Sequence, residues 1–410
     1  MVGQRTVLVT GATGNVGRHV VAQLLDTGAR VRALVRDPRI AALPDDVELV
    51  RGDLTEPESL RAALDGVGPL FLLWPFLSAE GAAEAVDVLA EHPRRIVYVS
   101  AMAVQDDLEP QANGVWGQVE DLIKRSGLEW TFLRASGFAT NTLGWADQIR
   151  VEGIVRWPYG DAARSLIHER DIAAVAVRAL TEDRHTGATY VLTGPEAVTQ
   201  AEQVRIIGEV VGLPVHWEEL APEVARQQLV AAMGDLAFAD SSLEYWARLR
   251  TEPEPVTRTV EEVTGTPART FAEWARDHAD DFRRLATAEV AEMYVSSFRT
   301  GNLGAAFGLL SPDMVRAAPM EGAGEPAELR GLDAIMENSQ RLNADYEIHG
   351  VDVDDPLVNQ DRFAVRFAFD ETHIPTGKRR TTAKVCLYTV ADGRVTREEV
   401  YYHEAPHLPA

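Results

Sequence analysis

Three glycines stand at a spacing that can hold a phosphate group. Gly11, Gly14 and Gly17 follow directly on the apolar, β-rich run at 6–10, and apolar residues then recur at helical spacing. A helix therefore begins where the glycines end. Glycines at such a junction permit a tight turn and close approach of a pyrophosphate, which the positive end of the helix dipole stabilises. The pattern predicts dinucleotide binding. A glycine-rich turn that holds no ligand is the alternative.

A cation follows the second expected strand, at 30–35. NAD-selective sites place a carboxylate at the end of this strand, where it accepts hydrogen bonds from the ribose hydroxyls. This sequence has Arg36 there, and a guanidinium suits the 2′-phosphate of NADP(H). The alternative is a solvated surface arginine. We therefore expect NADP(H) as the cofactor.

Two further polar residues end expected strands. Asp53 follows the third strand, 47–50, where it would either cap the next helix or bond the adenine. Ser100 closes the strand 95–99. It would lie where ligands meet the carboxyl ends of the strands in an open sheet.

The elements that must position these residues alternate between strands and helices. Strands are expected at 6–10, 30–35, 47–50, 70–73, 95–99 and 130–133, and helices after the glycines and at 56–64, 79–91 and 115–126. The strand at 70–73 is apolar throughout, as expected when both faces of a sheet are covered. Such alternation predicts a doubly wound parallel sheet of the α/β class, the Rossmann fold.

Bulk properties narrow the class of protein. A chain of 410 residues is long enough for two domains. A net charge of −23 disfavours nucleic acid and anionic membranes as partners. The single cysteine, Cys386, excludes an intramolecular disulfide and suits a reducing cytoplasm. No apolar stretch reaches the length of a membrane span, and no secretion signal opens the chain. We expect a cytoplasmic protein without a metal site, whose partner is a small-molecule substrate.

Residues 1–284 resemble the NmrA-like branch of the short-chain dehydrogenase superfamily. The resemblance is carried by the three glycines, Arg36, Gly52-Asp53-Leu54, 97–100, 120–134, 190–196 and 257–282. It implies an NAD(P)-binding domain with a substrate subdomain beyond residue 135. It also implies a cofactor site or rim made of Gly11, Thr13, Gly14, Asn15, Val16, Gly17, Arg36, Asp53, Leu54 and Ser100.

The sequence departs from that superfamily at one important place. Its reductases use a tyrosine and, four residues later, a lysine that lowers the tyrosine pKa so that the substrate oxygen can be protonated. Counting back from Glu120, these positions hold Ala112 and Trp116, which cannot transfer a proton. The resemblance thus supports cofactor binding more strongly than hydride transfer. His168 begins an expected helix, and we interpret it as structural first and as a proton donor second.

Residues 285–410 predict a separate α+β domain. A stretch rich in Pro, Glu and Thr at 251–267 and an amphipathic segment to residue 284 precede it. Helices are expected from residue 285, at 303–310 and at 332–342. Strands follow from Tyr346, with period-two alternation at 362–369, and an Asp392-Gly393 hairpin joins 383–390 to 395–403. Helices followed by a curved antiparallel sheet are expected.

This second part resembles the SnoaL-like branch of the nuclear transport factor 2-like superfamily, through 372–379, 385–388 and 392–399. The resemblance implies a cone with one open end and a homodimer formed through its open sheet. Cyclases of the branch carry an acid/base aspartate near the end of the last strand. His403 occupies that neighbourhood, on the same strand parity as Arg397, Glu399 and Tyr401. A binding or dimerisation role is the alternative.

Together the two resemblances imply an NADPH-dependent reductase of a polycyclic or aromatic ketone or quinone of secondary metabolism. The SnoaL-like domain would process or bind the product. The catalytic candidates are His403, Ser100 and His168. Two alternatives stay open: a single-chain reductase-hydroxylase of a quinone, and a non-catalytic, dinucleotide-binding redox sensor. The missing tyrosine and lysine favour the sensor, whereas the apolar segment after the sixth strand and the polar residues around His403 favour the enzyme.

Overall fold

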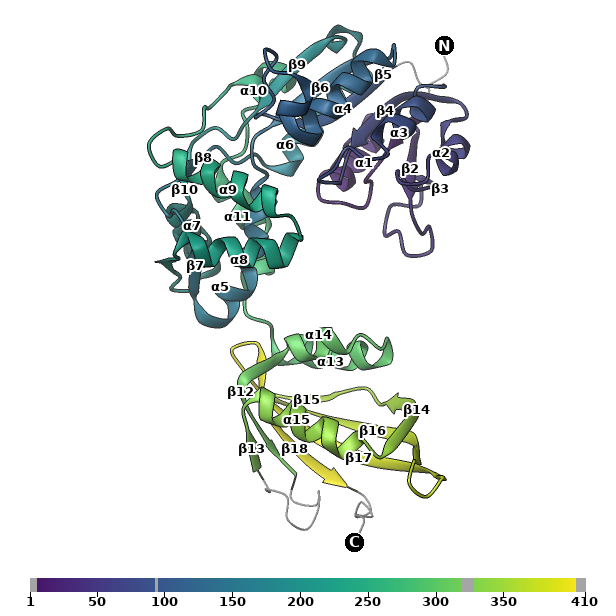
Figure 1. Ribbon diagram of the computed structural model, residues 1–410, viewed down its shortest axis with the longest axis vertical. Coiled ribbons are helices and arrows are strands. Elements are labelled where there is room, and N and C mark those ends of the chain that lie inside the picture. Colours follow the sequence, from purple (N-terminus) through teal and green to yellow (C-terminus); the bar gives the residue numbers. More distant parts are fainter. Residues whose placement is uncertain (1–5, 93–94, 319–327, 403–410) are drawn as a thin grey trace. The chain divides into compact units, whose positions relative to one another are not determined.

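The structure is a computed structural model that describes residues 6–92, 95–318 and 328–402 (Figure 1). The chain divides into two compact units. The first comprises Met1–Ala146 and Ile154–Asp281, and the second comprises Asp147–Gly153 and Phe282–Ala410. The expected boundary near residue 285 lies within four residues of the main division.

A parallel sheet forms the centre of the first unit. Its strands lie in the order β3-β2-β1-β4-β5-β6-β9, and every neighbouring pair is parallel. Their bounds are β1 Thr6–Val9, β2 Val31–Val35, β3 Glu48–Arg51, β4 Val67–Leu73, β5 Arg95–Ala101, β6 Glu129–Ala135 and β9 Ala188–Leu192. The predicted doubly wound sheet is confirmed, and β9 adds an edge strand that was not expected. The strand order reverses at β1, and open α/β sheets bind ligands at such a point.

Helices cover both faces of this sheet. One face packs against α1 (Gly17–Asp26), α6 (Glu169–Thr181) and α10 (Thr259–Thr264), and the other against α2 (Pro57–Leu64), α3 (Ala82–Leu89) and α4 (Gly114–Arg125). In α1 the apolar residues at helical spacing are the buried ones: Val20, Val21 and Leu24. Two apolar layers therefore fix the sheet, and the strand ends with their loops remain for a ligand.

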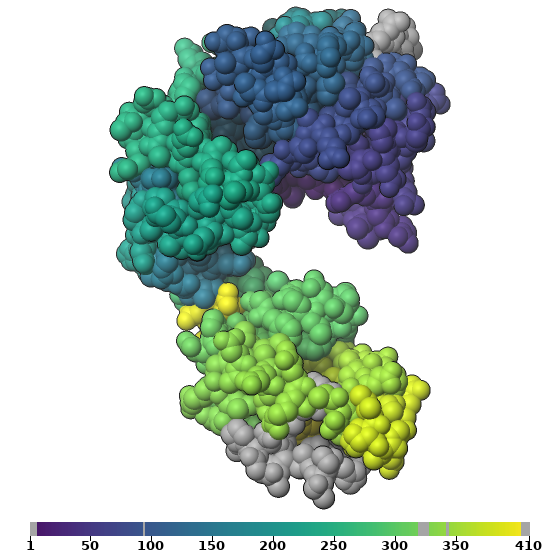
Figure 2. Space-filling model, in the orientation of Figure 1, coloured from purple at the N-terminus to yellow at the C-terminus, as the bar shows by residue number. Residues whose placement is uncertain are grey.

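The rest of the first unit is built from short strands and helices that follow β6. They are η2 (Ala139–Trp145), β7 (Ile154–Trp157), β8 (Ala163–Arg164), η3 (Asp183–His185), β10 (Val198–Thr199), α7 (Gln200–Val211), β11 (His216–Glu219), α8 (Pro222–Met233), α9 (Leu236–Arg248), α11 (Phe271–Asp277) and α12 (Ala279–Phe282). All but the first residue of α5 (Ala146–Glu152) belongs to the second unit. A short helix, η1 (Pro110–Asn113), precedes α4. On the face seen in Figure 2, the unit is hollowed between the green α8–α9 segment and the purple and blue segments that carry the first strands.

The second unit is a curved sheet with helices on its inner face. Its helices are α13 (Thr287–Arg299), α14 (Leu303–Gly308) and α15 (Leu332–Asn343), and its strands are β12 (Leu310–Ala317), β13 (Glu328–Arg330), β14 (Tyr346–Val353), β15 (Leu357–Asn359), β16 (Arg362–His373), β17 (Lys378–Ala391) and β18 (Arg394–Tyr402). The predicted α+β cone is confirmed, as is the hairpin at Asp392-Gly393 that joins β17 to β18.

Two expectations for this unit were wrong. The helix expected at 303–310 ends at Gly308, and the following residues form β12, which pairs with β18 in parallel. The sheet is thus mixed rather than antiparallel, and it does not simply follow the helices. β12 was not predicted because it contains Pro312 and Asp313, two residue types that are rare in strands.

Candidate functional site

The glycine loop lies between β1 and α1 and leaves its centre open. Thr13, Gly14 and Asn15 are exposed, and Gly11 has a φ of 60°. A Cβ on Gly17 would lie 2.0 Å from the Gly11 carbonyl oxygen, so the first turn of α1 closes directly onto the loop. Exposed amides at the start of a helix are what a pyrophosphate requires. The loop therefore fits the dinucleotide that the sequence predicts.

The cation after β2 has no partner. Arg36 is exposed and makes no hydrogen bond or ion pair with any residue of the described segments. The next residue, Asp37, accepts two hydrogen bonds from the Arg39 guanidinium, at 2.9 and 2.7 Å, and these lower the pKa of the Asp37 carboxyl. The carboxylate that could bind ribose hydroxyls is thus occupied, while Arg36 is free to meet a phosphate.

Asp53 orders the loop after β3. Its Oδ1 accepts hydrogen bonds from the Thr55 amide and hydroxyl, both at 2.9 Å. The N-cap of α2 is Glu56, so the alternative in which Asp53 caps this helix is wrong. Thr55 is only two residues from Asp53, so the Asp53 carboxylate bonds the Thr55 backbone and hydroxyl instead of the helix. Leu54 is buried beneath the loop.

Ser100 belongs to a buried polar network at the ends of β5 and β6. Its hydroxyl donates to Glu120 Oε1 at 2.7 Å, and both side chains are buried. Arg134 donates to the same carboxylate through Nε at 3.0 Å and Nη2 at 2.8 Å, and it also bonds Asp106. The Ser100 proton is therefore held by Glu120. In the sequence, Glu120 served only as the reference position for locating Ala112 and Trp116, and its contact with Ser100 was not predicted.

His168 lies at the N-cap of α6 and is buried. Its Nδ1 is 3.2 Å from the Arg170 amide nitrogen and from Glu169 Oε2, and its Nε2 is 3.3 Å from Asp277 Oδ2. Both ring nitrogens are thus engaged within the protein. This placement agrees with the structural interpretation of His168, which ranked above that of a proton donor.

Glu169, the next residue, gathers three histidines. His278 Nε2 lies 2.7 Å from its Oε1, and His19 of α1 lies 3.9 Å from the same oxygen. Burial opposes ionisation of Glu169, but the hydrogen bonds from His168 and His278 outweigh it and hold the carboxyl pKa below its usual value. Burial lowers the pKa of His19. These contacts tie α1, α6 and the segment after α11 together.

Ala112 and Trp116 stand where related reductases have the catalytic tyrosine and lysine, and neither can act as an acid. Ala112 lies in η1, and Trp116 in α4 packs against the apolar layer of α2, α3 and α4. Tyr98, on β5, is wholly buried, and burial raises the pKa of its hydroxyl far above the usual range. Within the part of the chain that the structure describes, the carboxyl ends of β5 and β6 offer a substrate no such tyrosine.

The inner face of the second unit carries a second polar cluster. Glu398 on β18 accepts hydrogen bonds from Tyr388 at 3.1 Å and from Arg316 Nε at 2.9 Å. The ring of Tyr294 lies 5.0 Å from that of Tyr388, and burial raises the pKa of both hydroxyls. A partly buried carboxylate beside two buried, neutral phenols can hold or move a proton.

The expected catalytic parity of β18 was wrong. Glu398, Val400 and Tyr402 share the inner face, since they pair with Tyr388, Cys386 and Lys384. Tyr401, which shares the parity expected of the catalytic face, is 52 % exposed. His403 itself lies outside the described residues. Alternation shows which residues of a strand share a face but not which of the two faces is buried, so the sequence alone could not decide between them.

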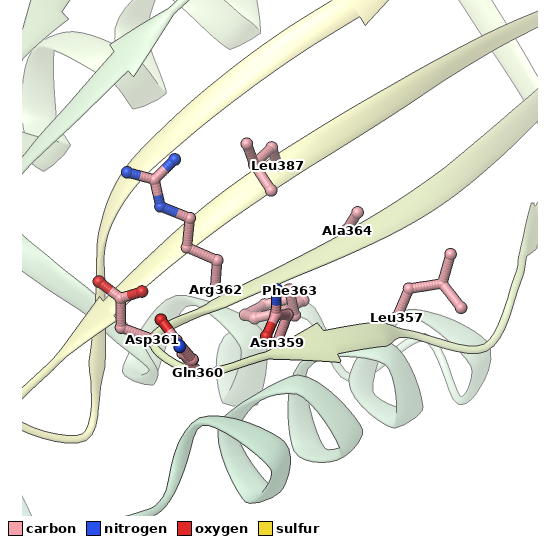
Figure 3. Close-up of a pocket in the computed structure, with 8 residues that line it drawn as sticks. All are labelled: Leu357, Asn359, Gln360, Asp361, Arg362, Phe363, Ala364 and Leu387. Atoms are coloured by element: carbon pink, nitrogen blue, oxygen red, sulfur yellow. The ribbon is translucent and has the colours of Figure 1, made fainter.

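One pocket of the second unit lies on the other side of the sheet from most of this cluster. It has a volume of about 460 Å³ and is lined by Leu357, Asn359, Gln360, Asp361, Arg362, Phe363, Ala364 and Leu387 (Figure 3). Ala364 and Leu387 are cross-strand partners on the outer face of the sheet. The pocket is therefore a surface depression rather than the interior of the cone.

Comparison with known proteins places these sites in families. The family model described as NAD(P)H-binding matches residues 11–183, and the SnoaL-like domain model matches residues 290–398. A phosphate-ester reductase of Streptomyces griseus, named (4-alkanoyl-5-oxo-2,5-dihydrofuran-3-yl)methyl phosphate reductase, is 40 % identical over 280 residues, which span 67 % of this chain and 99 % of the relative. The chain belongs to the NAD(P)H-binding family of oxidoreductases. Its C-terminal unit is a SnoaL-like domain.

A further relative supports this membership, and a solved structure shows the same fold. An NAD(P)H azoreductase of Xenophilus azovorans is 34 % identical over 282 residues, covering 67 % of this chain and 99 % of the relative. The crystal structure of an NADPH-dependent quinone oxidoreductase of Escherichia coli in complex with NADPH has the same fold, with a TM-score of 0.55 at 23 % identity, over 66 % of this chain and 99 % of its own. Among the described residues, no helix is long and apolar enough to cross a membrane.

Proposed function

We propose that this oxidoreductase uses NADPH to reduce a quinone or a related polycyclic or aromatic ketone of secondary metabolism. The preference for NADPH is inferred from the side chains that follow β2. Asp37 is held by Arg39, whereas Arg36 is exposed and unpartnered among the described residues. A charge-assisted bond from a guanidinium to a phosphate contributes about 1.5–3 kcal/mol, so NADPH is preferred over NADH.

The residues that would hold the cofactor are those of the glycine loop and the loops beside it. The amides of the exposed residues Thr13 and Asn15 would receive the pyrophosphate just before α1, while the Gly14 amide donates to the Gly11 carbonyl at 2.9 Å and holds the turn. Asp53 keeps its Oδ2 atom available for the adenine side, since only Oδ1 accepts the bonds from Thr55. NADPH, when bound, supplies the hydride.

A quinone suits a site without the tyrosine and lysine. Hydride addition to a simple ketone leaves an alkoxide, a strong base that requires an acid in the protein. Addition to a quinone leaves a phenolate-like oxygen, and phenols have a pKa of about 10, so water can supply the proton. Ala112 and Trp116 are therefore compatible with quinone reduction. The names of the two reductase relatives support chemistry of this redox kind over the sensor alternative.

The SnoaL-like domain would bind or process the reduced product. The Glu398–Tyr388–Arg316 cluster on its inner face supports this role, because it combines a proton acceptor with buried donors. The reductase-hydroxylase alternative would use the same face. Catalytic roles for Ser100, His168 and His403 are proposed from the sequence alone.

We also propose a homodimer formed through the outer face of the second sheet. Val385 and Tyr401 are cross-strand partners there, and they are 42 % and 52 % exposed. Leu387 lies on the same face and is partly exposed. Apolar side chains gathered on an open sheet favour burial against a second copy. A cytoplasmic location is proposed from the lone, buried thiol of Cys386.

The experiment that tests the proposed function is NADPH oxidation with a panel of quinones and simple aromatic ketones. The full-length protein should oxidise NADPH with quinones and prefer NADPH to NADH. Tight NADPH binding without turnover of any member of the panel would support the sensor alternative instead.

A further inference from the structure

Arg164 lies against the backbone that directly follows β6. A Cβ on Gly137 would lie 2.0 Å from Arg164 Nη2 and 2.8 Å from Cζ, so the guanidinium rests on the Gly137 Cα. The two segments are held together, since the Ile167 amide donates to the Gly137 carbonyl at 3.0 Å. Gly137 comes two residues after the carboxyl end of β6. This is the edge of the sheet at which open α/β folds bind their ligands.

The Arg164 guanidinium forms an ion pair with the buried Glu254 but no hydrogen bond among the described residues. In the segments that the structure describes, Arg164 makes no hydrogen bond, and its Nε is buried without an acceptor. In the ion pair, Nε lies 3.5 Å from Glu254 Oε1, which leaves the Nη1 and Nη2 donors without a protein acceptor in the described segments. The Glu254 carboxylate is already used by the Ser165 amide at 2.8 Å and the Tyr245 hydroxyl at 2.5 Å.

An arginine in this condition is unusual. A guanidinium has five N–H donors, and buried polar groups in proteins are generally hydrogen-bonded. Arg134 at the end of the same strand illustrates the normal case, because it bonds both Glu120 and Asp106. The Arg164 side chain is 13 % exposed, so a small ligand can reach it.

We propose that Arg164 binds a negatively charged oxygen of the substrate. The proposal rests on the reductase function argued above and specifies its substrate contact. The charge has two possible sources: a fixed anionic substituent such as a phosphate, sulfonate or carboxylate, or the carbonyl oxygen that takes up charge during reduction. In the second case a hydride and its electron pair pass from NADPH to the quinone, the oxygen becomes phenolate-like, and water supplies the proton. Both sources share the recognition of an oxyanion by a guanidinium.

The first measurement is binding rather than turnover. The full-length protein, saturated with NADP⁺ so that no reaction occurs, is titrated with 1,4-naphthoquinone-2-sulfonate and, separately, with inorganic phosphate. Arg164→Gln should weaken sulfonate binding by about 10- to 100-fold, the factor that corresponds to a charge-assisted bond. Gly137→Ala should do likewise, because its methyl group displaces the guanidinium without removing the charge. Arg250→Gln, which removes an exposed arginine paired with Asp161, is the matched control and should change nothing.

The second measurement separates the two sources. If the anion is a fixed substituent, Arg164→Gln raises KM for the sulfonate and leaves a neutral naphthoquinone unaffected. If Arg164 instead binds the carbonyl oxygen that is being reduced, Arg164→Gln lowers kcat for both quinones. NADP⁺ affinity and the unfolding midpoint serve as folding controls for each variant.

Three outcomes would overturn the proposal. One is unchanged sulfonate binding and unchanged kinetics in both folded variants. Another is equal losses in Arg250→Gln. The third is a wild-type protein that binds neither sulfonate nor phosphate. A wild type that binds the sulfonate through Arg164 but reduces no quinone would contradict the proposed function alone.

Discussion

The Cα of Gly17 lies so close to the carbonyl group of Gly11 that a Cβ would stand 2.0 Å from its oxygen and 2.6 Å from its carbon. Gly14, three residues earlier, has a different environment. Its Cβ would lie 3.2 Å from the same oxygen, and the residue is exposed. Gly14 also helps to close the turn, because its amide donates to the Gly11 carbonyl at 2.9 Å, but it is exposed and a ligand can lie beside it.

Gly14→Val should abolish most dinucleotide binding with little effect on folding. The branched side chain would occupy the space of the pyrophosphate, and we expect NADPH affinity to fall by about 100-fold or more. Fluorescence titration with NADPH and thermal unfolding measure the two effects. Gly17→Ala is the contrasting variant, since its methyl group meets backbone atoms and should destabilise the fold by about 1–3 kcal/mol. Unchanged NADPH affinity in folded Gly14→Val would show the motif to be only a structural turn.

Arg36→Ala should erase most of the preference for NADPH over NADH. The guanidinium is exposed and unpartnered among the described residues, so its loss removes a phosphate contact of about 1.5–3 kcal/mol, or roughly 10- to 100-fold in affinity. Dissociation constants for both dinucleotides provide the test. Arg30→Ala, an exposed arginine just before the opposite end of β2, is the control. An undiminished preference in Arg36→Ala would place the phosphate elsewhere.

His278→Gln should lower stability in a manner that depends on pH. Burial disfavours the charged imidazole, but hydrogen bonds to Glu169 and Asp281 outweigh it and raise the His278 pKa above its usual value of 6.5. The stabilisation, about 1.5–3 kcal/mol, is therefore fully present below pH 6.5 and is lost as the pH rises through the raised pKa. Glu169, whose pKa is lowered, stays ionised throughout this window.

Urea unfolding of wild type and His278→Gln between pH 5.5 and 9 measures that dependence. The difference in unfolding free energy should be largest at the acidic end and shrink towards the alkaline end. His19, whose pKa burial lowers, destabilises the folded state as it is protonated, and it is present in both proteins. A difference independent of pH would mean that His278 only fills space.

Val385→Glu should convert the proposed dimer into monomers without unfolding either unit. Val385 is 42 % exposed on the outer face of the second sheet, so the chain alone tolerates a charge there, whereas an interface would bury it. Sedimentation velocity should show the dimer dissociation constant rising by tenfold or more. Ile374→Glu, at a 58 % exposed position in the turn between β16 and β17, is the control. A wild-type protein that is monomeric at all concentrations would contradict the proposed interface.

The sequence by itself determined the parts of this protein that depend on local pattern. Glycine spacing, the alternation of strands and helices and the Asp392-Gly393 turn are properties of neighbouring residues. They predicted the doubly wound sheet, a cofactor loop and an α+β second domain, whereas the cone was implied by the family resemblance. Arg36 belongs here too, because the end of β2 follows from the strand itself.

Only the tertiary structure decided which polar side chains meet. Arg316 and Glu398 are far apart in the sequence and meet because β12 pairs with β18. Arg164 and Gly137 meet because their two segments are joined by the bridge between Phe138 and Ile167. The inner face of β18 was misjudged because a period of two gives alternation but not its phase. Pairing with β17 fixes that phase: Glu398 lies opposite the buried Tyr388, and Tyr401 lies opposite the exposed Val385.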